Sequence, residues 1–220
     1  MLDGFSLPWV KVCGLTRAED VTAAVEAGAD AVGFVAWEGS PRYVASSRVA
    51  ELVEGLPAGV RSVGVMVEAD PHQGGVWAES AGVGVLQLCG DQNPRDWEGF
   101  PLPLLRRIGV EEGAAELMDE WGEVASGFVL DHPSSPGGSG RVVNTSLAAT
   151  LAGQAPCLLA GGLDPEWVPR AVRDIRPGGV DASSGLETEP GIKSPEKVAA
   201  FVARALKALE TMKNLEAREG

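Results

Sequence analysis

The sequence predicts an α/β protein folded as a single (β/α)8 barrel of the TIM type over residues 1–220. Short apolar runs rich in β-branched residues recur about every 20 to 30 residues, and helical patterns separate most of them. Eight such units favour a closed barrel, because an open doubly wound sheet usually needs about five or six strands. The residues of chemical interest fall at or just after the ends of these runs, where a barrel holds its active site.

The apolar runs are the predicted strands, and in chain order they are Trp9–Val12, Ala31–Val35, Ser62–Val67, Val83–Leu88, Leu102–Ile108, Gly127–Leu130, Cys157–Ala160 and Gly179–Asp181. Thr16 and Glu19 have the spacing of a capping box at the start of the first helix. The predicted helices are Ala18–Ala27, Arg48–Leu56, Ala114–Trp121, Pro165–Arg173 and a last one from Ser194 through Ala203–Leu209. We expect residues 1–8 to form a short N-terminal extension and residues 211–220 to form a frayed tail.

Composition narrows the class of protein. Apolar residues make up 45% of the chain, enough to bury the core of one domain. No run reaches the roughly 18 apolar residues of a membrane span, and the N-terminus lacks the basic start of a secretory signal, so we expect a cytoplasmic protein without membrane contact. Cys13, Cys89 and Cys157 lie far apart in a chain with two histidines, which argues against a disulfide framework or a metal site.

The net charge of −13 repels a nucleic-acid backbone, so we predict no nucleic-acid partner. The same charge repels a phosphorylated metabolite at long range. A phosphate site in this chain must therefore depend on short-range backbone amides and on one or two local arginines.

Two glycine-centred turns follow predicted strands and predict such a site. Gly161 and Gly162 follow one strand and Gly185 follows another, with Asp164 opening a helical pattern behind the first turn. Without side chains, the backbone can approach an anion closely, and amides at a helix start carry partial positive charge. We expect the ligand to be a small phosphorylated molecule.

Four side chains could carry chemistry or binding, and each has a plain structural alternative. Cys13 ends the first strand and could reach the barrel mouth, although a lone cysteine is more often a small buried hydrophobe. Asp131 and Asp181 end strands and could exchange protons or could simply shape turns. Arg42 could bind a carboxylate or stack on an aromatic ring, although loop arginines are commonly solvated. The glycines of Pro133–Gly140 suggest a mobile cover over the site. The six tryptophans are scattered and suit packing or surface positions.

A series of motifs in order along the chain resembles the phosphoribosylanthranilate isomerase family of tryptophan biosynthesis. The resemblance runs from Val10 to about Ala205, and its first, fifth and last motifs together are highly specific. The motifs are Lys11-Val-Cys-Gly-Leu-Thr16, Gly28-Ala-Asp-Ala-Val-Gly-Phe-Val35, Ser40-Pro-Arg-Tyr43, Leu86-Gln-Leu88, Leu130-Asp131 with Gly137-Gly-Ser-Gly140, Ala160-Gly-Gly-Leu163 and Val180-Asp-Ala-Ser-Ser-Gly185.

The resemblance implies an Amadori rearrangement of N-(5-phosphoribosyl)anthranilate with Cys13 as general base and Asp131 as general acid. It implies no metal, redox cofactor or covalent adduct. By the same resemblance Arg42 contacts the anthranilate and Asp181 orients the substrate. The phosphate is expected at Gly161, Gly162, Ser183 and Ser184.

Three positions depart from the family pattern. Cys89 stands where a histidine is usual at the mouth, and Val143-Asn-Thr145 replaces Phe-Asp-Trp. Arg106 is matched to a lysine common in the fifth strand. Two other functions stay open: an aldose–ketose isomerase or epimerase acting on another phosphosugar, and a non-catalytic phosphometabolite-binding barrel. The sequence does not distinguish a monomer from a homodimer.

Overall fold

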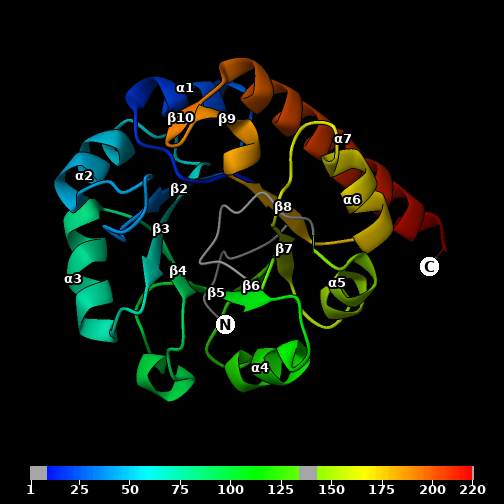
Figure 1. Ribbon diagram of the computed structural model, residues 1–220, viewed down its shortest axis with the longest axis horizontal. Helices are drawn as coiled ribbons and strands as arrows, with labels where there is room; N and C mark the ends of the chain where they lie inside the picture. Colours follow the sequence, from blue (N-terminus) through cyan, green and yellow to red (C-terminus); the bar gives the residue numbers. More distant parts are fainter. Residues whose placement is uncertain (1–8, 134–142, 220) are drawn as a thin grey trace.

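A computed structural model describes residues 9–133 and 143–219, in which eight parallel strands close into a barrel (Figure 1). The strands pair in sequence order, and β1 closes the ring against β8 with Lys11 opposite Asp181. The strands are β1 (Val10–Val12), β2 (Ala31–Val35), β3 (Arg61–Val67), β4 (Val85–Cys89), β5 (Leu104–Gly109), β6 (Gly127–Asp131), β7 (Cys157–Leu159) and β8 (Gly179–Ala182). Each overlaps one predicted strand, and the predicted barrel is confirmed.

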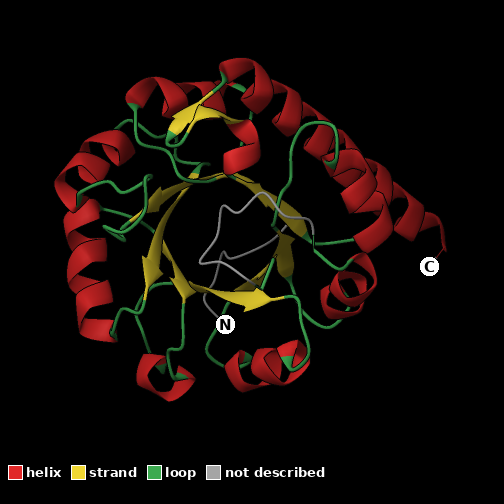
Figure 2. Ribbon diagram, in the orientation of Figure 1, coloured by secondary structure: helices red, strands yellow, loops and turns green. Residues whose placement is uncertain are grey.

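Helices surround the barrel and cover the outer faces of its strands (Figure 2). A short 3-10 helix, η1 (Pro94–Trp97), stands between β4 and β5. The α-helices are α1 (Ala18–Glu26), α2 (Ser46–Glu54), α3 (Pro71–Ala81), α4 (Ala114–Trp121), α5 (Thr145–Ala152), α6 (Val168–Ile175) and α7 (Pro195–Glu219). No helix is predicted from the sequence for the segments of α3 and α5.

The capping box predicted for α1 is wrong. Arg17 is the N-cap residue and makes no side-chain capping hydrogen bond. The Thr16 hydroxyl instead donates to the carbonyl oxygen of Gly191 at 2.6 Å. Thr16 therefore joins the end of the first strand to a distant segment rather than closing the helix beside it.

The last helix is longer than the sequence predicts. We expect fraying from Thr211, whereas α7 continues to Glu219. Leu209 is buried and Met212 packs against the core, so apolar contacts extend past the predicted end. Among the described residues, α7 included, no helix is long and apolar enough to cross a membrane.

Alternate residues of the strands fill the barrel interior in layers. The lower layer is apolar and is formed by Trp9, Ala31, Val63, Val85, Leu105, Val129, Leu158 and Ala160. Two residues beyond Trp9 and Val85 stand Lys11 and Gln87, and Asp181 pairs with Lys11 across the seam between β1 and β8; all three are buried. The strand period therefore places a polar layer between the apolar floor and the mouth of the barrel.

A small hairpin, not predicted from the sequence, follows β8. Ser184–Leu186 forms a 3-10 helix, η2, and leads into the antiparallel strands β9 (Glu187–Glu189) and β10 (Ile192–Lys193). Pro190 and Gly191 join the two strands, and Gly191 has a φ of +83°. The hairpin lies beside α1 and the start of α7 (Figure 1).

Candidate active site

One cavity of about 260 Å³ opens at the ends of the barrel strands. Every predicted site residue lines it, so residues up to 171 positions apart in the chain meet at one surface. These residues are Cys13, Arg42, Asp131, Gly161, Gly162, Asp181, Ser183 and Ser184. The predicted cover, Pro133–Gly140, falls largely on residues 134–142, outside the described part of the chain.

Cys13 follows β1 directly and is 8% exposed. A Cβ atom built on Gly33 would lie 2.8 Å from its Sγ and 3.2 Å from Cε of Lys11. The absence of a side chain at Gly33 thus makes room for both groups. Burial raises the pKa of the Cys13 thiol, and the nearby Lys11 ammonium opposes that rise.

Lys11 is fully buried beneath the cavity. Its Nζ donates to Oδ2 of Asp181 at 2.8 Å and to Oε1 of Gln87 at 3.1 Å. Burial alone would favour the neutral amine, but Asp181 and Cys13 outweigh it and raise the pKa of Lys11 above its ordinary value. Lys11 is therefore a cation between the thiol and a carboxylate.

One carboxylate oxygen of Asp181 is available to a ligand. Its Oδ2 accepts from Lys11, whereas its Oδ1 is buried and has no hydrogen-bond partner among the described residues. An unpartnered buried oxygen costs free energy unless a ligand or water satisfies it. Since Asp181 lines the cavity, a ligand hydroxyl there would supply the missing donor.

Asp131 is the last residue of β6 and is held on both oxygens. The His132 amide donates to Oδ1 at 2.7 Å, and Nε of Arg107 donates to Oδ2 at 3.3 Å. Arg107 also donates to the His132 carbonyl at 2.6 Å. These contacts fix the orientation of the carboxyl group at the edge of the cavity.

The fifth-strand assignment from the family pattern needs correction. Arg106 faces outward, where its guanidinium lies 4.9 Å from the ring centroid of Trp121 and donates to Oε1 of Gln92 at 2.7 Å. Arg107, the next residue, lines the cavity. Because neighbouring strand residues face opposite sides, a shift of one position exchanges the two roles.

Cys89 also differs from the expectation of a residue at the mouth. It is 1% exposed and packs with Cys13, Val35 and Val65 just inside the barrel. Burial raises its pKa to about 11, against the opposing effect of Arg107. Cys89 is therefore a protonated packing residue at neutral pH.

The two glycine turns form one surface. Gly161 and Gly162 have φ values of +80° and +69°, in the left-handed region that favours glycine. A Cβ atom on Gly185 would lie 2.1 Å from the Leu163 carbonyl oxygen, so the turns are in direct contact. Among the described residues, no group accepts a hydrogen bond from the amides of Gly161, Gly162, Ser183 or Ser184. These amides suit an anion.

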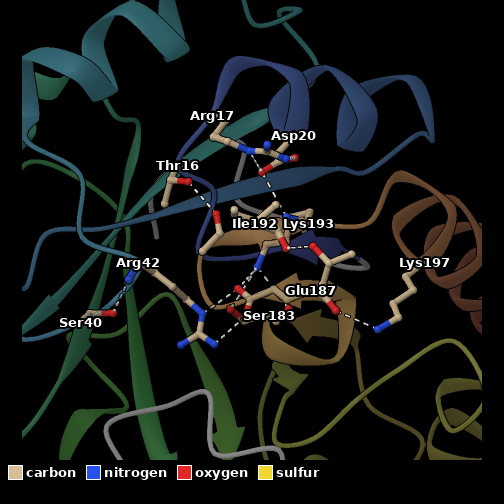
Figure 3. Close-up of polar contacts among 12 residues, drawn as sticks. Thr16, Arg17, Asp20, Ser40, Arg42, Ser183, Glu187, Ile192, Lys193 and Lys197 are labelled. Carbon is tan, nitrogen blue, oxygen red and sulfur yellow. Dashed lines mark hydrogen bonds and ion pairs between the residues drawn. The ribbon is translucent and has the colours of Figure 1, made fainter.

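Arg42 approaches the cavity from the loop after β2 and is anchored by Glu187 (Figure 3). Its Nε donates to Oε1 of Glu187 at 2.8 Å and its Nη2 donates to Oε2 at 2.7 Å. Lys193 donates to the same Oε1 at 2.7 Å. Burial opposes ionisation of Glu187, but these hydrogen bonds outweigh it and lower its pKa.

Sequence reasoning missed five residues of this site: Lys11, Gln87, Arg107, Glu187 and Lys193. The period of two along β1, β4 and β5 could have found the first three, because each stands two residues from a neighbour that faces the interior. Glu187 and Lys193 flank the Pro190–Gly191 turn, which is a hairpin signal. Trp37, expected at a packing or surface position, also lines the cavity.

Comparison with known proteins gives the family. The family model for N-(5'-phosphoribosyl)anthranilate isomerase matches residues 10–204. The chain is 42% identical over 206 residues to the N-(5'-phosphoribosyl)anthranilate isomerase of Dechloromonas aromatica, covering 92% of this chain and 98% of that protein.

Solved structures agree with this match. One shows monomers derived from the dimeric phosphoribosylanthranilate isomerase of Thermotoga maritima, with a TM-score of 0.82 and 30% identity over 91% of this chain and 100% of that one. A phosphoribosylanthranilate isomerase in complex with reduced 1-(o-carboxyphenylamino)-1-deoxyribulose 5-phosphate has a TM-score of 0.81, with 30% identity and the same coverage. The chain belongs to the N-(5'-phosphoribosyl)anthranilate isomerase family.

Proposed function

We propose that this chain converts N-(5'-phosphoribosyl)anthranilate to 1-(2-carboxyphenylamino)-1-deoxyribulose 5-phosphate in tryptophan biosynthesis, with Cys13 as general base and Asp131 as general acid. The observation that carries the assignment is that the thiol directly after β1 and the carboxyl group at the end of β6 line one cavity. An internal isomerisation needs an acid and a base at different atoms of one sugar. The family match supports the same reaction.

The first step opens the ribose ring. Asp131 in its acid form transfers a proton to the ring oxygen, the bond from C1' to that oxygen breaks, and the anthranilate nitrogen forms a Schiff base with C1'. The carboxylate that remains lies against Arg107 and the His132 amide, which favour its negative charge. Both groups are in place before the substrate arrives, so little reorganisation is needed.

The second step moves the double bond. Cys13 as thiolate removes the proton from C2', the electron pair shifts toward the nitrogen, and the resulting enolamine tautomerises to the ketose. The Lys11 ammonium beneath the thiol favours the thiolate that this step requires. The free Oδ1 of Asp181 suits a sugar hydroxyl and would hold the ribose chain between the acid and the base.

The two ends of the substrate have separate anion sites in this proposal. The amides of Gly161, Gly162, Ser183 and Ser184 bind the phosphate, since among the described residues they have no other acceptor. Arg42 binds the anthranilate carboxylate, which its guanidinium can meet edge on. Neither site depends on the charge of the whole molecule, which is −13.

The test is turnover by the purified chain and by two variants. The reaction is monitored by the decrease in the fluorescence of the anthranilate substrate, and NMR identifies the ketose product. We expect Cys13→Ala and Asp131→Ala each to lower kcat roughly 10²–10⁴-fold, the range of one general acid or base, because the proton each group moves then has no carrier. Circular dichroism checks that both variants are folded.

Three outcomes would contradict this assignment. Full activity in either variant would remove that residue from the mechanism. Turnover of another phosphosugar, with the anthranilate compound left unchanged, would favour the hypothesis of an aldose–ketose isomerase or epimerase that acts on that sugar. Tight binding of a product analogue without turnover would favour a binding barrel.

The assembly and location are part of the proposal. A related enzyme is described as dimeric, which supports a homodimer here. Sedimentation equilibrium distinguishes the 22.8 kDa chain from a species of twice that mass. A cytoplasmic location fits an enzyme of this family, and cell fractionation would test it.

A further inference from the structure

Glu187 joins two cations at the edge of the proposed active site. It is 8% exposed and receives two hydrogen bonds from Arg42 and one from Lys193, at distances of 2.7 to 2.8 Å (Figure 3). Arg42 comes from the loop after β2, and Glu187 begins the hairpin after β8. One carboxylate therefore ties together two loops that are 145 residues apart in the chain.

Lys193 carries the connection on to the phosphate turn. Its Nζ donates to the Ser183 carbonyl at 3.2 Å and to the Ser183 hydroxyl at 3.4 Å. Its side chain is fully buried. Ser183, Lys193, Glu187 and Arg42 thus form a continuous chain of contacts between the proposed phosphate site and the proposed carboxylate site.

The surrounding elements hold this chain of contacts in place. The Lys193 amide donates to Oδ2 of Asp20 in α1 at 3.2 Å, and Lys197 in α7 donates to the Glu187 carbonyl at 2.8 Å. A Cβ atom built on Gly14 would lie 2.5 Å from Cδ of Arg42 and 2.8 Å from Oγ of Ser183. Arg42 and Ser183 therefore meet above a glycine that leaves them space.

The geometry leaves Arg42 one free edge. Nε and Nη2 face Glu187, whereas Nη1 makes no hydrogen bond to a described residue, and Arg42 lines the cavity. A bidentate pair fixes the plane of a guanidinium as well as its position. The remaining donor, Nη1, is therefore held in one orientation before a ligand binds, so binding costs little further side-chain entropy.

We propose that Glu187 and Lys193 are positioning residues that set the distance between Arg42 and the Ser183 turn, so that the cavity selects a ligand with a carboxylate at one end and a phosphate at the other. Buried ion pairs contribute little net stability compared with apolar residues of the same volume, so positioning explains this one better. The proposal rests on the isomerase function above, since it assigns a substrate group to each end of this chain of contacts.

The experiment compares two probes on the full chain and its variants. Reduced 1-(o-carboxyphenylamino)-1-deoxyribulose 5-phosphate engages both ends, and inorganic phosphate engages one. Calorimetry measures the affinity of the first, and phosphorus NMR titration measures the second. Because both are binding measurements, they do not depend on turnover. Wild-type chain that binds the two-ended probe without isomerising the substrate would overturn the proposed function and leave this proposal standing.

Glu187→Gln should weaken the two-ended probe and raise KM roughly 10- to 100-fold, the effect of misplacing one charged hydrogen bond, with inorganic phosphate affinity and kcat within about twofold. Arg42→Ala should likewise weaken the two-ended probe and raise KM. In the double variant the two losses should not multiply, because Glu187 acts through Arg42. Lys193→Met should weaken both probes, since Lys193 also holds Ser183.

Glu189→Gln is the matched control, because Glu189 lies in the same short strand and is exposed. It should bind both probes like the wild-type chain. If Glu187→Gln unfolds, the variant Glu187→Gln with Lys193→Met removes one charge of each sign and should show the same selective loss for the two-ended probe over inorganic phosphate, beyond the loss seen in Lys193→Met. Multiplying effects of the Glu187 and Arg42 variants, equal weakening of both probes by Glu187→Gln, or no change in KM would overturn the proposal.

Discussion

At the scale of single residues, Lys11 has the largest influence on the proposed base. It lies beneath the cavity, bonded to Asp181 and Gln87, and close enough to Cys13 for its charge to act on the thiol. Burial favours the protonated thiol, which is inactive as a base. The rate of the C2' proton abstraction should therefore rise with pH as the thiol ionises, with a midpoint above the ordinary thiol pKa.

Lys11→Met should move this rising limb of kcat/KM to higher pH. Without the ammonium, the thiol pKa rises further, and at a fixed pH below that pKa the rate falls with the thiolate fraction, by about tenfold if the pKa rises by one. A pH–rate profile with the natural substrate measures this directly. Thermal unfolding establishes whether the variant is folded, since removing one partner leaves Asp181 unpaired. A limb at the same pH in both proteins would exclude Lys11 from control of Cys13.

Motifs in the sequence predicted which residues meet at the cavity, but they did not predict the contacts between them. Cys13, Asp131 and Asp181 are found where strand ends were predicted. Arg107 was overlooked in favour of Arg106, because a family pattern aligned by spacing alone does not resolve which side of a strand a residue faces. The Glu187 and Lys193 contacts bridge distant loops and leave no local pattern to read.

At the scale of elements, strongly periodic segments were predicted and segments with weak patterns were missed. The helix predicted over Ala114–Trp121 has those bounds in the structure. In contrast, α3 contains Gly74 and Gly75, which lower helix propensity. Its start signal was present: Pro71 at the first turn, with the Asp70 carboxylate accepting from the Gln73 amide at 2.8 Å. The N-cap therefore contributes more to the formation of α3 than the helix propensity of its interior residues does.

Asp70→Ala should therefore destabilise the protein by about 1 kcal/mol, the usual value of an N-cap side chain. This corresponds to a fall in Tm of roughly 2–4 °C for a domain of this size. Urea and thermal unfolding measure both quantities. Glu79→Gln, at an exposed position of the same helix, is the control and should change stability by less than about 0.5 kcal/mol. Equal stability of Asp70→Ala and the control would show that packing alone specifies α3.

At the scale of the whole molecule, the barrel isolates a cationic site within an acidic protein. The net charge is −13, yet Arg42 and Arg107 line the cavity and two buried lysines, Lys11 and Lys193, lie next to it. These four cations pair with three carboxylates, Asp131, Asp181 and Glu187. The local balance is therefore slightly positive. The acidic composition predicts no nucleic-acid partner, but it could not reveal this local reversal of charge, because the reversal depends on which residues face the inside of the closed sheet.

The folded barrel also holds three buried thiols, and stability should fall at alkaline pH. Burial raises the pKa of Cys157 and of Cys89 from 9.0 to about 11. Above pH 9 the unfolded chain releases thiol protons that the folded chain retains, so the free energy of unfolding falls until the folded pKa is passed. Cys157 and Cys89 each contribute about 2 kcal/mol to this fall by pH 11.

Cys157→Ala tests this effect away from the cavity. Urea unfolding at pH 8.5 and pH 11 should show that the variant loses about 2 kcal/mol less than the wild-type chain between the two conditions, although its stability at pH 8.5 is lower because a buried sulfur has been deleted. An identical loss in both proteins would mean that Cys157 titrates normally in the folded state.

The ion pair between Arg42 and Glu187 limits how freely the mouth of this barrel can be rebuilt. Barrels of this class are commonly regarded as modular, with each loop exchangeable on a constant frame. Here the loop after β2 and the hairpin after β8 are joined across the end of β1, and the hairpin is tied in turn to α1 and α7. Replacing either segment alone would leave the charged side chain of the other segment without its ion-pair partner, so the two segments would have to be replaced together.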